Sequence, residues 1–216
     1  MDESEIGISI LAKAPIPGFS KTRLIPLLGE DGAAKLQARF IERTVETARE
    51  AAVGPITIWY TPTEWGEYFA RYSCLSSVRL MPQEDEDLGC KMNRCVANRL
   101  SRFGELVIGT DSPCIQAIDL EAAASALLSR FDAVLFPAED GGYGLIGLRM
   151  PDIAVFSGVS WSSENVLQET RQNLLSLGKQ WGELVSVWDV DRPADVVRLA
   201  KSPAAELLQG IYAEAT

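Results

Sequence analysis

The residues of this chain that could first do chemistry are three cations near its N-terminus: Lys13, Lys21 and Arg23. They lie in LAKAPIPGFSKTRL, residues 11–24, an irregular stretch that follows a strand-like apolar run. Arginine can grip a phosphate through two donors, and lysine supplies a point charge. Because the chain has a formal net charge of −10, this local positive charge indicates an anionic ligand. The alternative is a solvated loop whose cations balance nearby acids.

Carboxylates follow two later apolar runs. The stretch VIGTDSPCI places Asp111 after one run, and VSVWDVDRPADV places Asp189 and Asp191 after another. Mg²⁺ and Mn²⁺ take oxygen ligands and bridge to phosphates, so Asp111 with Asp191 or Asp189 could hold such an ion opposite the cationic loop. An ordinary turn at Asp111, and a helix N-cap at Asp191, are the alternatives.

Three further stretches suggest contacts with a ligand. In FPAEDGGYGLIGL, glycines let backbone approach a ligand closely and a tyrosine offers a ring with a hydroxyl; a tight turn between two strands is the alternative. In SWSSENV, a tryptophan and serines could shape an acceptor pocket or simply anchor and cap a helix. In DEDLGCKMN, a glycine at a helix start could lie against a nucleotide. The acceptor-binding candidates are Gly142, Tyr143, Trp161, Ser162 and Ser163.

The composition excludes several classes of function. The 216 residues include no histidine, which excludes Ser-His and Cys-His nucleophile pairs and Cys/His zinc sites. Four cysteines without CxxC spacing indicate reduced thiols rather than a disulfide scaffold. Net acidity argues against a nucleic-acid partner. No apolar run is long enough to span a membrane and the N-terminus is acidic, so we expect a cytoplasmic protein.

Apolar runs of strand length alternate with amphipathic patterns of helix length along the whole chain, which predicts one α/β domain, residues 1–216, with a mainly parallel sheet. Glycine and proline around 145–148 and 153–156 favour irregular or antiparallel pairing there. Ligands of such sheets bind beyond the carboxyl ends of the strands, where the charged stretches fall. We predict strands at 6–11, 56–60, 78–81, 105–108, 133–136, 145–148, 153–156 and 184–188, and helices at 32–51, 64–72, 88–103, 119–129 (capped by Asp119), 163–177 and 194–200.

Six stretches, in order, resemble the DUF2064 family of glycosyltransferases, within the nucleotide-diphospho-sugar transferase superfamily. They are KAPIPGFSKTRL, DLGCKM, GTDSPCI, PAEDGGYGLIGL, FSGVSWSSENVL and WDVDRPADVVRL, and they span nearly the whole chain. The resemblance implies a three-layer α/β/α Rossmann-like GT-A fold, with a mainly parallel central sheet and an antiparallel part. Similar loops occur in guanylyltransferases that act on phospholactate and in those of the molybdenum cofactor.

The resemblance also implies roles for individual residues. Asp111 and Asp191 would hold Mg²⁺ or Mn²⁺. Arg192, Ala194 and the pair Cys90-Lys91 depart from the pattern, where relatives carry Thr, an acid and Glu-Arg. The residues implied to bind the nucleotide are Ala12, Lys13, Lys21, Arg23, Leu88, Gly89 and Lys91.

Two reactions fit this pattern. In the first, a metal-dependent transferase takes a glycosyl group from a nucleotide-sugar to a small-molecule acceptor. Lys21 and Arg23 would stabilise the departing phosphates, and Asp140, with Glu139 as the alternative, would be the base of an inverting reaction. In the second, a nucleotidyltransferase joins a nucleoside triphosphate to a small phosphorylated acid and releases pyrophosphate. The opening loop lacks the Gly-Gly and later Arg of ordinary nucleotidyltransferases, which favours the first. A nucleotide-binding module without turnover is a third interpretation.

Overall fold

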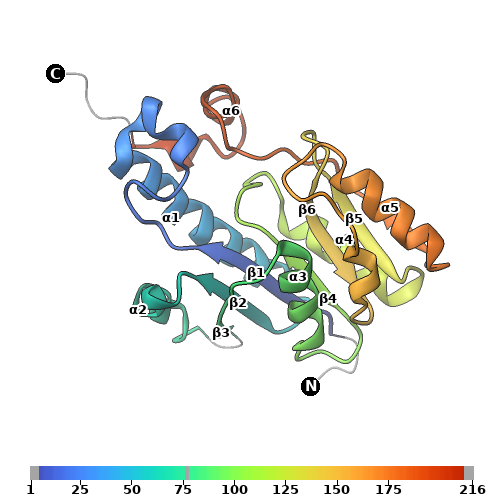
Figure 1. Cartoon of the computed structure of the whole chain (residues 1–216). Coiled ribbons are helices and arrows are strands. Elements are labelled where there is room, and N and C mark those ends of the chain that lie inside the picture. Colours follow the sequence, from blue (N-terminus) through green and yellow to red (C-terminus); the bar gives the residue numbers. More distant parts are fainter. Residues whose placement is uncertain (1–4, 76–77, 212–216) are drawn as a thin grey trace.

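The computed structural model describes residues 5–75 and 78–211, which build a seven-stranded sheet with helices on both faces (Figure 1). The strand order is β3-β2-β1-β4-β6-β5-β7, and β6 runs antiparallel to both of its neighbours while the other pairings are parallel. This confirms the predicted fold class, including the antiparallel part. The strands are β1 (Gly7–Lys13), β2 (Ile56–Thr61), β3 (Val78–Pro82), β4 (Glu105–Ile108), β5 (Ala133–Pro137), β6 (Tyr143–Leu148) and β7 (Trp181–Glu183).

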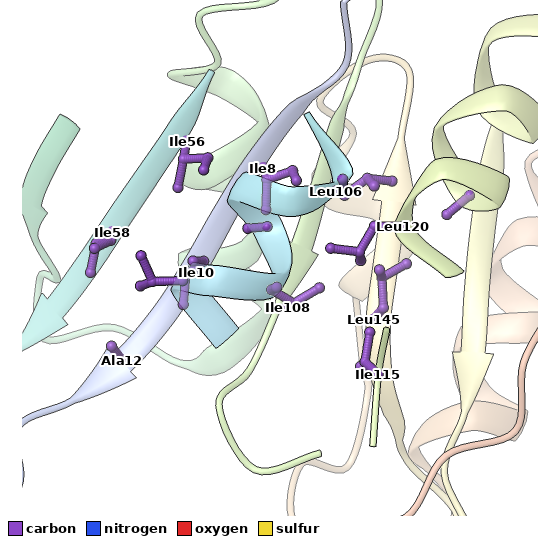
Figure 2. Close-up of a cluster of buried hydrophobic side chains, with 14 of the residues drawn as sticks. Ile8, Ile10, Ala12, Ile56, Ile58, Leu106, Ile108, Ile115, Leu120 and Leu145 are labelled. Carbon is purple, nitrogen blue, oxygen red and sulfur yellow. The ribbon is translucent and has the colours of Figure 1, made fainter. Parts of the chain in front are cut away.

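Two helical layers cover the sheet. On one face α1 and α4 pack over alternate residues of the strands, because successive side chains of a strand point to opposite faces. Figure 2 shows Ile8, Ile10, Ile58 and Ile108 of these strands with Leu120 of α4. On the other face α3 and α5 pack over the remaining side chains. The helices are α1 (Ile25–Ala51), α2 (Gly66–Phe69), α3 (Leu88–Ala97), α4 (Ala117–Ser129), α5 (Val166–Ser176) and α6 (Pro193–Leu199), with 3₁₀ turns η1 (Thr22–Leu24), η2 (Thr63–Trp65), η3 (Ala70–Tyr72), η4 (Ile153–Phe156) and η5 (Ala205–Leu208).

A third apolar cluster joins the first helix, α1, to the last elements of the chain, α6 and η5. The first half of α1 contributes Leu28, Leu36 and Phe40, which pack with α6 and η5. Val190, completely buried, belongs to this cluster. The segment after β7 therefore returns to the start of α1 (Figure 1), which brings its carboxylates to the cationic loop.

Several predicted element boundaries are wrong. Segment 153–156 is the 3₁₀ turn η4, whose start is capped by the Asp152 side chain accepting from the Ala154 amide. Segment 184–188 is not a regular strand: the parallel pairing with β5 ends at Leu135 and Glu183, Pro137 has no amide hydrogen to donate, and Val187 forms an isolated bridge with Ala138. Segment 64–72 is three short turns rather than one helix.

Other predicted helices differ at their ends: α1 begins at Ile25 rather than at 32, and α5 spans Val166–Ser176 rather than 163–177. α3 stops at Ala97 rather than at 103, since the Asn98 side chain donates to the Arg94 carbonyl and takes over the helix end. α4 begins at Ala117, and its N-cap is Gln116; Asp119 instead completes a capping box by accepting from the Gln116 amide.

Candidate active site

A cavity of about 520 Å³ opens at the carboxyl ends of β1 and β4. These two strands are neighbours and parallel, and ligands of such sheets bind beyond the carboxyl ends of the strands. The cavity therefore lies where the sequence predicts a site. Its lining includes Lys13, Phe19, Lys21, Arg23, Gln37, Leu88, Asp111, Ser112, Tyr143, Gly144, Asp189 and Asp191.

The loop after β1 is fixed by its own hydrogen bonds. The buried Ser20 hydroxyl donates to the Ala14 carbonyl at 2.6 Å and accepts from the Ile16 amide at 2.7 Å. Gly18 has a φ of 78°, a conformation that few other residues adopt without strain. The loop thus presents its cations from a defined backbone rather than from a solvated tether.

Lys21 and Arg23 are each paired with an acid across the cavity. The Lys21 ammonium lies 2.7 Å from Asp111 Oδ1 and donates to the Val190 carbonyl at 2.7 Å, and its side chain is only 4% exposed. The Arg23 guanidinium pairs with Asp191, and both side chains are largely exposed. The two predicted phosphate-binding cations therefore contact the two predicted metal carboxylates.

Asp189 is the more enclosed acid of the segment after β7. It accepts a hydrogen bond from the Ser112 hydroxyl. Its pKa is raised to about 6, mainly by burial and in smaller part by the negative charges of Asp111 and Asp140, while the hydrogen bond from Ser112 lowers it. A side chain at Gly144 would meet the Ser112 Oγ at 2.7 Å, so glycine is needed for Ser112 to reach Asp189.

Asp191 does not cap α6, so the capping alternative is wrong. The N-cap is Arg192, and Asp195 accepts from the backbone amides of both Asp191 and Arg192, at 3.0 and 2.7 Å. Pro193 stands at the first helical position, as predicted. The Asp191 carboxylate is consequently free to pair with Arg23 and to line the cavity.

The two candidate bases lie in the turn between β5 and β6. Asp140 is exposed and accepts a hydrogen bond from the Gly142 amide at 3.0 Å, which shapes the turn. Glu139 forms two hydrogen bonds with Arg198, at 2.6 and 2.8 Å, and these lower the pKa of Glu139. The pairing with Arg198 and the lowered pKa make Glu139 less ready to accept a proton.

The predicted acceptor-binding residues fall into two places. Tyr143 lines the cavity. Its hydroxyl is buried, and this burial raises the pKa of the phenol well above its usual value. Trp161 instead lines a separate hollow of about 380 Å³. Ser162 adopts a left-handed conformation with a φ of 67°, and Ser163 accepts from the Asn165 amide just before α5. Gly142 lies in the turn described above.

The remaining predicted nucleotide-binding residues are also divided. Leu88 lines the cavity, whereas a side chain at Gly89 would meet Phe156 Cβ at 2.7 Å and Trp161 Cζ2 at 2.8 Å. Gly89 therefore permits close packing of α3 against the neighbouring loop. Lys91 follows on α3 and is half-buried, and Ala12 is completely buried in β1.

Sequence reasoning missed Gln37. This buried residue of α1 donates from Nε2 to the Lys13 carbonyl and to the Thr110 hydroxyl, each at 3.1 Å, and it lines the cavity. It ties the end of β1 to the loop that carries Asp111. A glutamine on the core-facing side of an amphipathic helix was the available signal, since buried polar groups need partners.

Carboxylates alone do not complete a metal site here. Within residues 5–75 and 78–211, no three acidic or cysteine side chains gather closely enough to hold an ion. Asp111 and Asp189 nevertheless interact electrostatically at one edge of the cavity. This donor set fits Mg²⁺ or Mn²⁺ bound by one or two carboxylates and completed by water and phosphate oxygens.

Comparison with solved structures finds a similar protein over nearly the full length. The crystal structure of a "putative nucleotide-diphospho-sugar transferase" from Desulfovibrio desulfuricans G20 is 27% identical, with a TM-score of 0.82, covering 95% of this chain and 94% of that one. Rv0371c from Mycobacterium tuberculosis H37Rv, in complex with manganese, is 15% identical with a TM-score of 0.55, covering 91% of this chain and 99% of that one. CMP:2-keto-3-deoxy-manno-octonic acid synthetase complexed with CTP is 13% identical with a TM-score of 0.60, covering 94% and 100%.

These neighbours agree with the expected enzyme class, a transferase, and with the expected fold. A search of curated proteins finds no match. None of the helices in the described part of the chain is long and apolar enough to cross a membrane. The family model for DUF2064, described as an uncharacterized protein conserved in bacteria, matches residues 44–163, which is more than half of the sequence. The chain belongs to the DUF2064 family.

Proposed function

We propose that this chain is a metal-dependent transferase that takes a glycosyl group from a nucleotide-diphospho-sugar and gives it to a small-molecule acceptor. We further propose that residues 1–216 act as one catalytic domain. The observation that carries the proposal is the convergence of cations and carboxylates on one cavity at the carboxyl ends of β1 and β4. The similarity to the Desulfovibrio protein over 95% of the chain supports the same class of donor.

The charges in the cavity match a diphosphate with its metal. Lys13 and Arg23 supply positive charge from the end of β1 and from η1, and Asp111 and Asp189 supply oxygen ligands from the facing side. An otherwise acidic protein has to concentrate positive charge where it binds an anion. When bound to Asp111 and Asp189, with Asp191 as the alternative second ligand, Mg²⁺ or Mn²⁺ would neutralise the charge that builds on the departing diphosphate.

Protein groups would handle the acceptor and its proton. Asp140 is our candidate for the base, because it is exposed and its negative charge raises the pKa of Asp189, which lines the cavity. Tyr143 would form an apolar side of the acceptor pocket, since its hydroxyl points away into a buried position. Trp161 and the serines after it lie by the second hollow and would contact only an acceptor large enough to extend beyond the main cavity.

The second candidate is nucleotidyl transfer. It is favoured by the Lys-Thr-Arg sequence of the opening loop, since the cations of this sequence would equally hold a triphosphate. The two reactions differ in what leaves. Glycosyl transfer releases a nucleoside diphosphate, and nucleotidyl transfer releases pyrophosphate.

The experiment is a screen of nucleotide-sugars and nucleoside triphosphates with Mg²⁺ or Mn²⁺, with both products measured. We expect slow release of nucleoside diphosphate from one nucleotide-sugar even without acceptor, with water in its place. The Asp111→Asn variant should keep its fold and lose at least about tenfold in Mn²⁺-dependent nucleotide affinity by calorimetry, because one of two acidic ligands is gone. Pyrophosphate from a triphosphate would establish the second candidate, and unchanged affinity in the variant would remove the metal role of Asp111.

A further inference from the structure

Lys21 occupies a position that a solvated phosphate-binding lysine would not need. Its backbone has φ 48° and ψ 44°, a left-handed conformation that costs a non-glycine residue free energy. Its side chain is 4% exposed, and its ammonium lies 5.5 Å from the centre of the Phe40 ring. The strained backbone directs the charge inward, toward the acids.

The ammonium is coordinated by oxygens in the way a bound cation would be. Asp111 Oδ1 and the Val190 carbonyl each lie 2.7 Å from Nζ. The Val190 amide in turn donates to the Asp111 carbonyl at 2.9 Å, which holds these two oxygen-bearing segments together. Asp111 is itself 52% exposed to the cavity, so a second cation can reach it from solvent. Lys21 and an incoming metal would meet at the same carboxylate.

We propose that Lys21 is an internal cation that competes with the divalent metal for Asp111, so that arrival of the metal–nucleotide complex and release of Lys21 toward the phosphates are one coupled event. This inference rests on the proposed function of the same cavity. Two positive charges beside one carboxylate repel each other strongly at the low effective dielectric of a partly buried site. The displaced ammonium then finds a diphosphate, the best available partner for it.

Arg23, two residues after Lys21, forms an ion pair with another acid of the cavity, Asp191. Its pair with Asp191 is exposed on both sides, so solvent and salt weaken it far more than the Lys21 pair. The Lys21–Asp111 pair fastens the loop at residues 14–24 to the segment after β4, and the contacts of Lys21 with Val190 and of Arg23 with Asp191 fasten it to the segment after β7. Release of Lys21 would therefore loosen the loop before the nucleotide orders it again.

A permanent structural ion pair is the competing explanation, and it predicts the opposite result. If Lys21 only positions Asp111, removing its charge leaves the carboxylate poorly placed, and metal binding becomes weaker or stays the same. If Lys21 competes with the metal, removing its charge makes metal binding tighter. The sign of the change therefore separates the two explanations.

The test is Mn²⁺ binding without nucleotide, measured by electron paramagnetic resonance of the free ion, for wild type and Lys21→Met. Methionine keeps a long apolar side chain against Phe40 and removes the charge. We expect about 5- to 20-fold tighter Mn²⁺ binding in Lys21→Met. The matched control is Lys13→Met, which removes a charge from an exposed lysine of the same cavity that forms no ion pair within the described residues. Lys13→Met should change Mn²⁺ binding by less than about threefold, since solvent screens the charge of Lys13.

Equal or weaker binding in Lys21→Met than in Lys13→Met overturns the competition. If wild type binds Mn²⁺ and Asp111→Asn does not, the metal role of the cavity stands even where the competition fails. If neither wild type nor Lys21→Met binds Mn²⁺, the competition fails, and the metal role of Asp111 is decided by the Mn²⁺-dependent nucleotide affinity, because phosphate oxygens complete the proposed donor set.

A second measurement uses the unaltered protein and does not depend on the folding of a variant. Hydrogen exchange of residues 14–24, followed by mass spectrometry, should become faster with Mn²⁺ alone and slower again when a nucleoside diphosphate is added. Mg²⁺ should act in the same direction. Slower or unchanged exchange with the metal alone contradicts the coupled release of the loop.

Discussion

The carboxyl groups of Asp189, which is half-buried, and of Glu105, which is buried, lie at opposite ends of the sheet, and each accepts a hydrogen bond from a serine. Asp189 lies beyond the carboxyl ends of the parallel strands and accepts a hydrogen bond from Ser112. Glu105 begins β4 at the other end and accepts a hydrogen bond from Ser9 at 2.6 Å. Burial is the main cause that raises the pKa of each, to about 6 for Asp189 and about 7 for Glu105. Chemically the two groups look alike.

Their surroundings differ. Asp189 lines the cavity and is affected by the like charges of two other acids. Glu105 is 1% exposed; the closest charges acting on it are those of Arg79 and Arg99, which lower its pKa. Its Oε2 has no hydrogen-bond partner within residues 5–75 and 78–211, and it lies where a side chain on Gly7 would stand, only 2.0 Å from the Cβ position. A raised pKa therefore indicates burial, and it indicates a site only together with a cavity and converging charges.

The largest expected difference between the two acids is in turnover. Asp189→Asn should lower the rate of nucleoside diphosphate release by about 10²- to 10³-fold, because it removes a charge that acts on the reacting phosphates. Glu105→Gln should leave the rate within about twofold, since Glu105 does not line the cavity. Both rates are measured with the donor found in the screen. Equal losses in the two variants would mean that the ends of the sheet are not functionally distinct.

The second prediction concerns the pH dependence of stability. The Glu105 carboxyl binds its proton more tightly in the folded protein than in the unfolded chain, because its folded pKa is about 7 and its ordinary value is 4.5. Stability from this group is complete below pH 4.5 and is lost as the pH rises toward 7. Between pH 5 and pH 8 the loss in the free energy of unfolding is about 2–3 kcal/mol.

Glu105→Gln removes this loss, since the amide does not ionise. The variant should be about 2–3 kcal/mol less sensitive than wild type to the change from pH 5 to pH 8. Urea unfolding at the two pH values measures the difference. A wild type and a Glu105→Gln variant with parallel pH profiles would show that Glu105 is ionised in the fold at pH 5.

The same contrast explains what the sequence could predict. Segment 105–108, ELVI, is buried throughout, and its boundaries are predicted correctly because the apolar residues that follow Glu105 have the pattern of a strand buried on both faces. Segment 184–188 is also rich in apolar residues but does not form a regular strand, since Pro137 on the neighbouring strand β5 has no amide hydrogen to donate. The sequence pattern of one segment carries no information about an irregularity in the strand beside it.

For the site, sequence order predicts which end of the sheet holds the charges but not how they pair. Lys21 and Asp111 both follow strands, so their meeting at one edge could be expected. The burial of Lys21 depends on the carbonyl of Val190, which lies 169 residues further along the chain. Gln37 was missed for a related reason, since its partners come from β1 and from the loop after β4.

The smallest expected effect is at a third carboxylate, which is exposed. Glu139 pairs with Arg198 in two hydrogen bonds, but the side chains are 56% and 46% exposed, so water and salt screen the pair. Arg198→Gln should therefore leave the free energy of unfolding nearly unchanged. It also tests the assignment of the base, because losing Arg198 allows the lowered pKa of Glu139 to rise toward its ordinary value. If Asp140 is the base, the pH–rate profile of Arg198→Gln should overlay that of wild type. If the acidic limb of that profile moves to higher pH, Glu139 takes the proton and Asp140 does not.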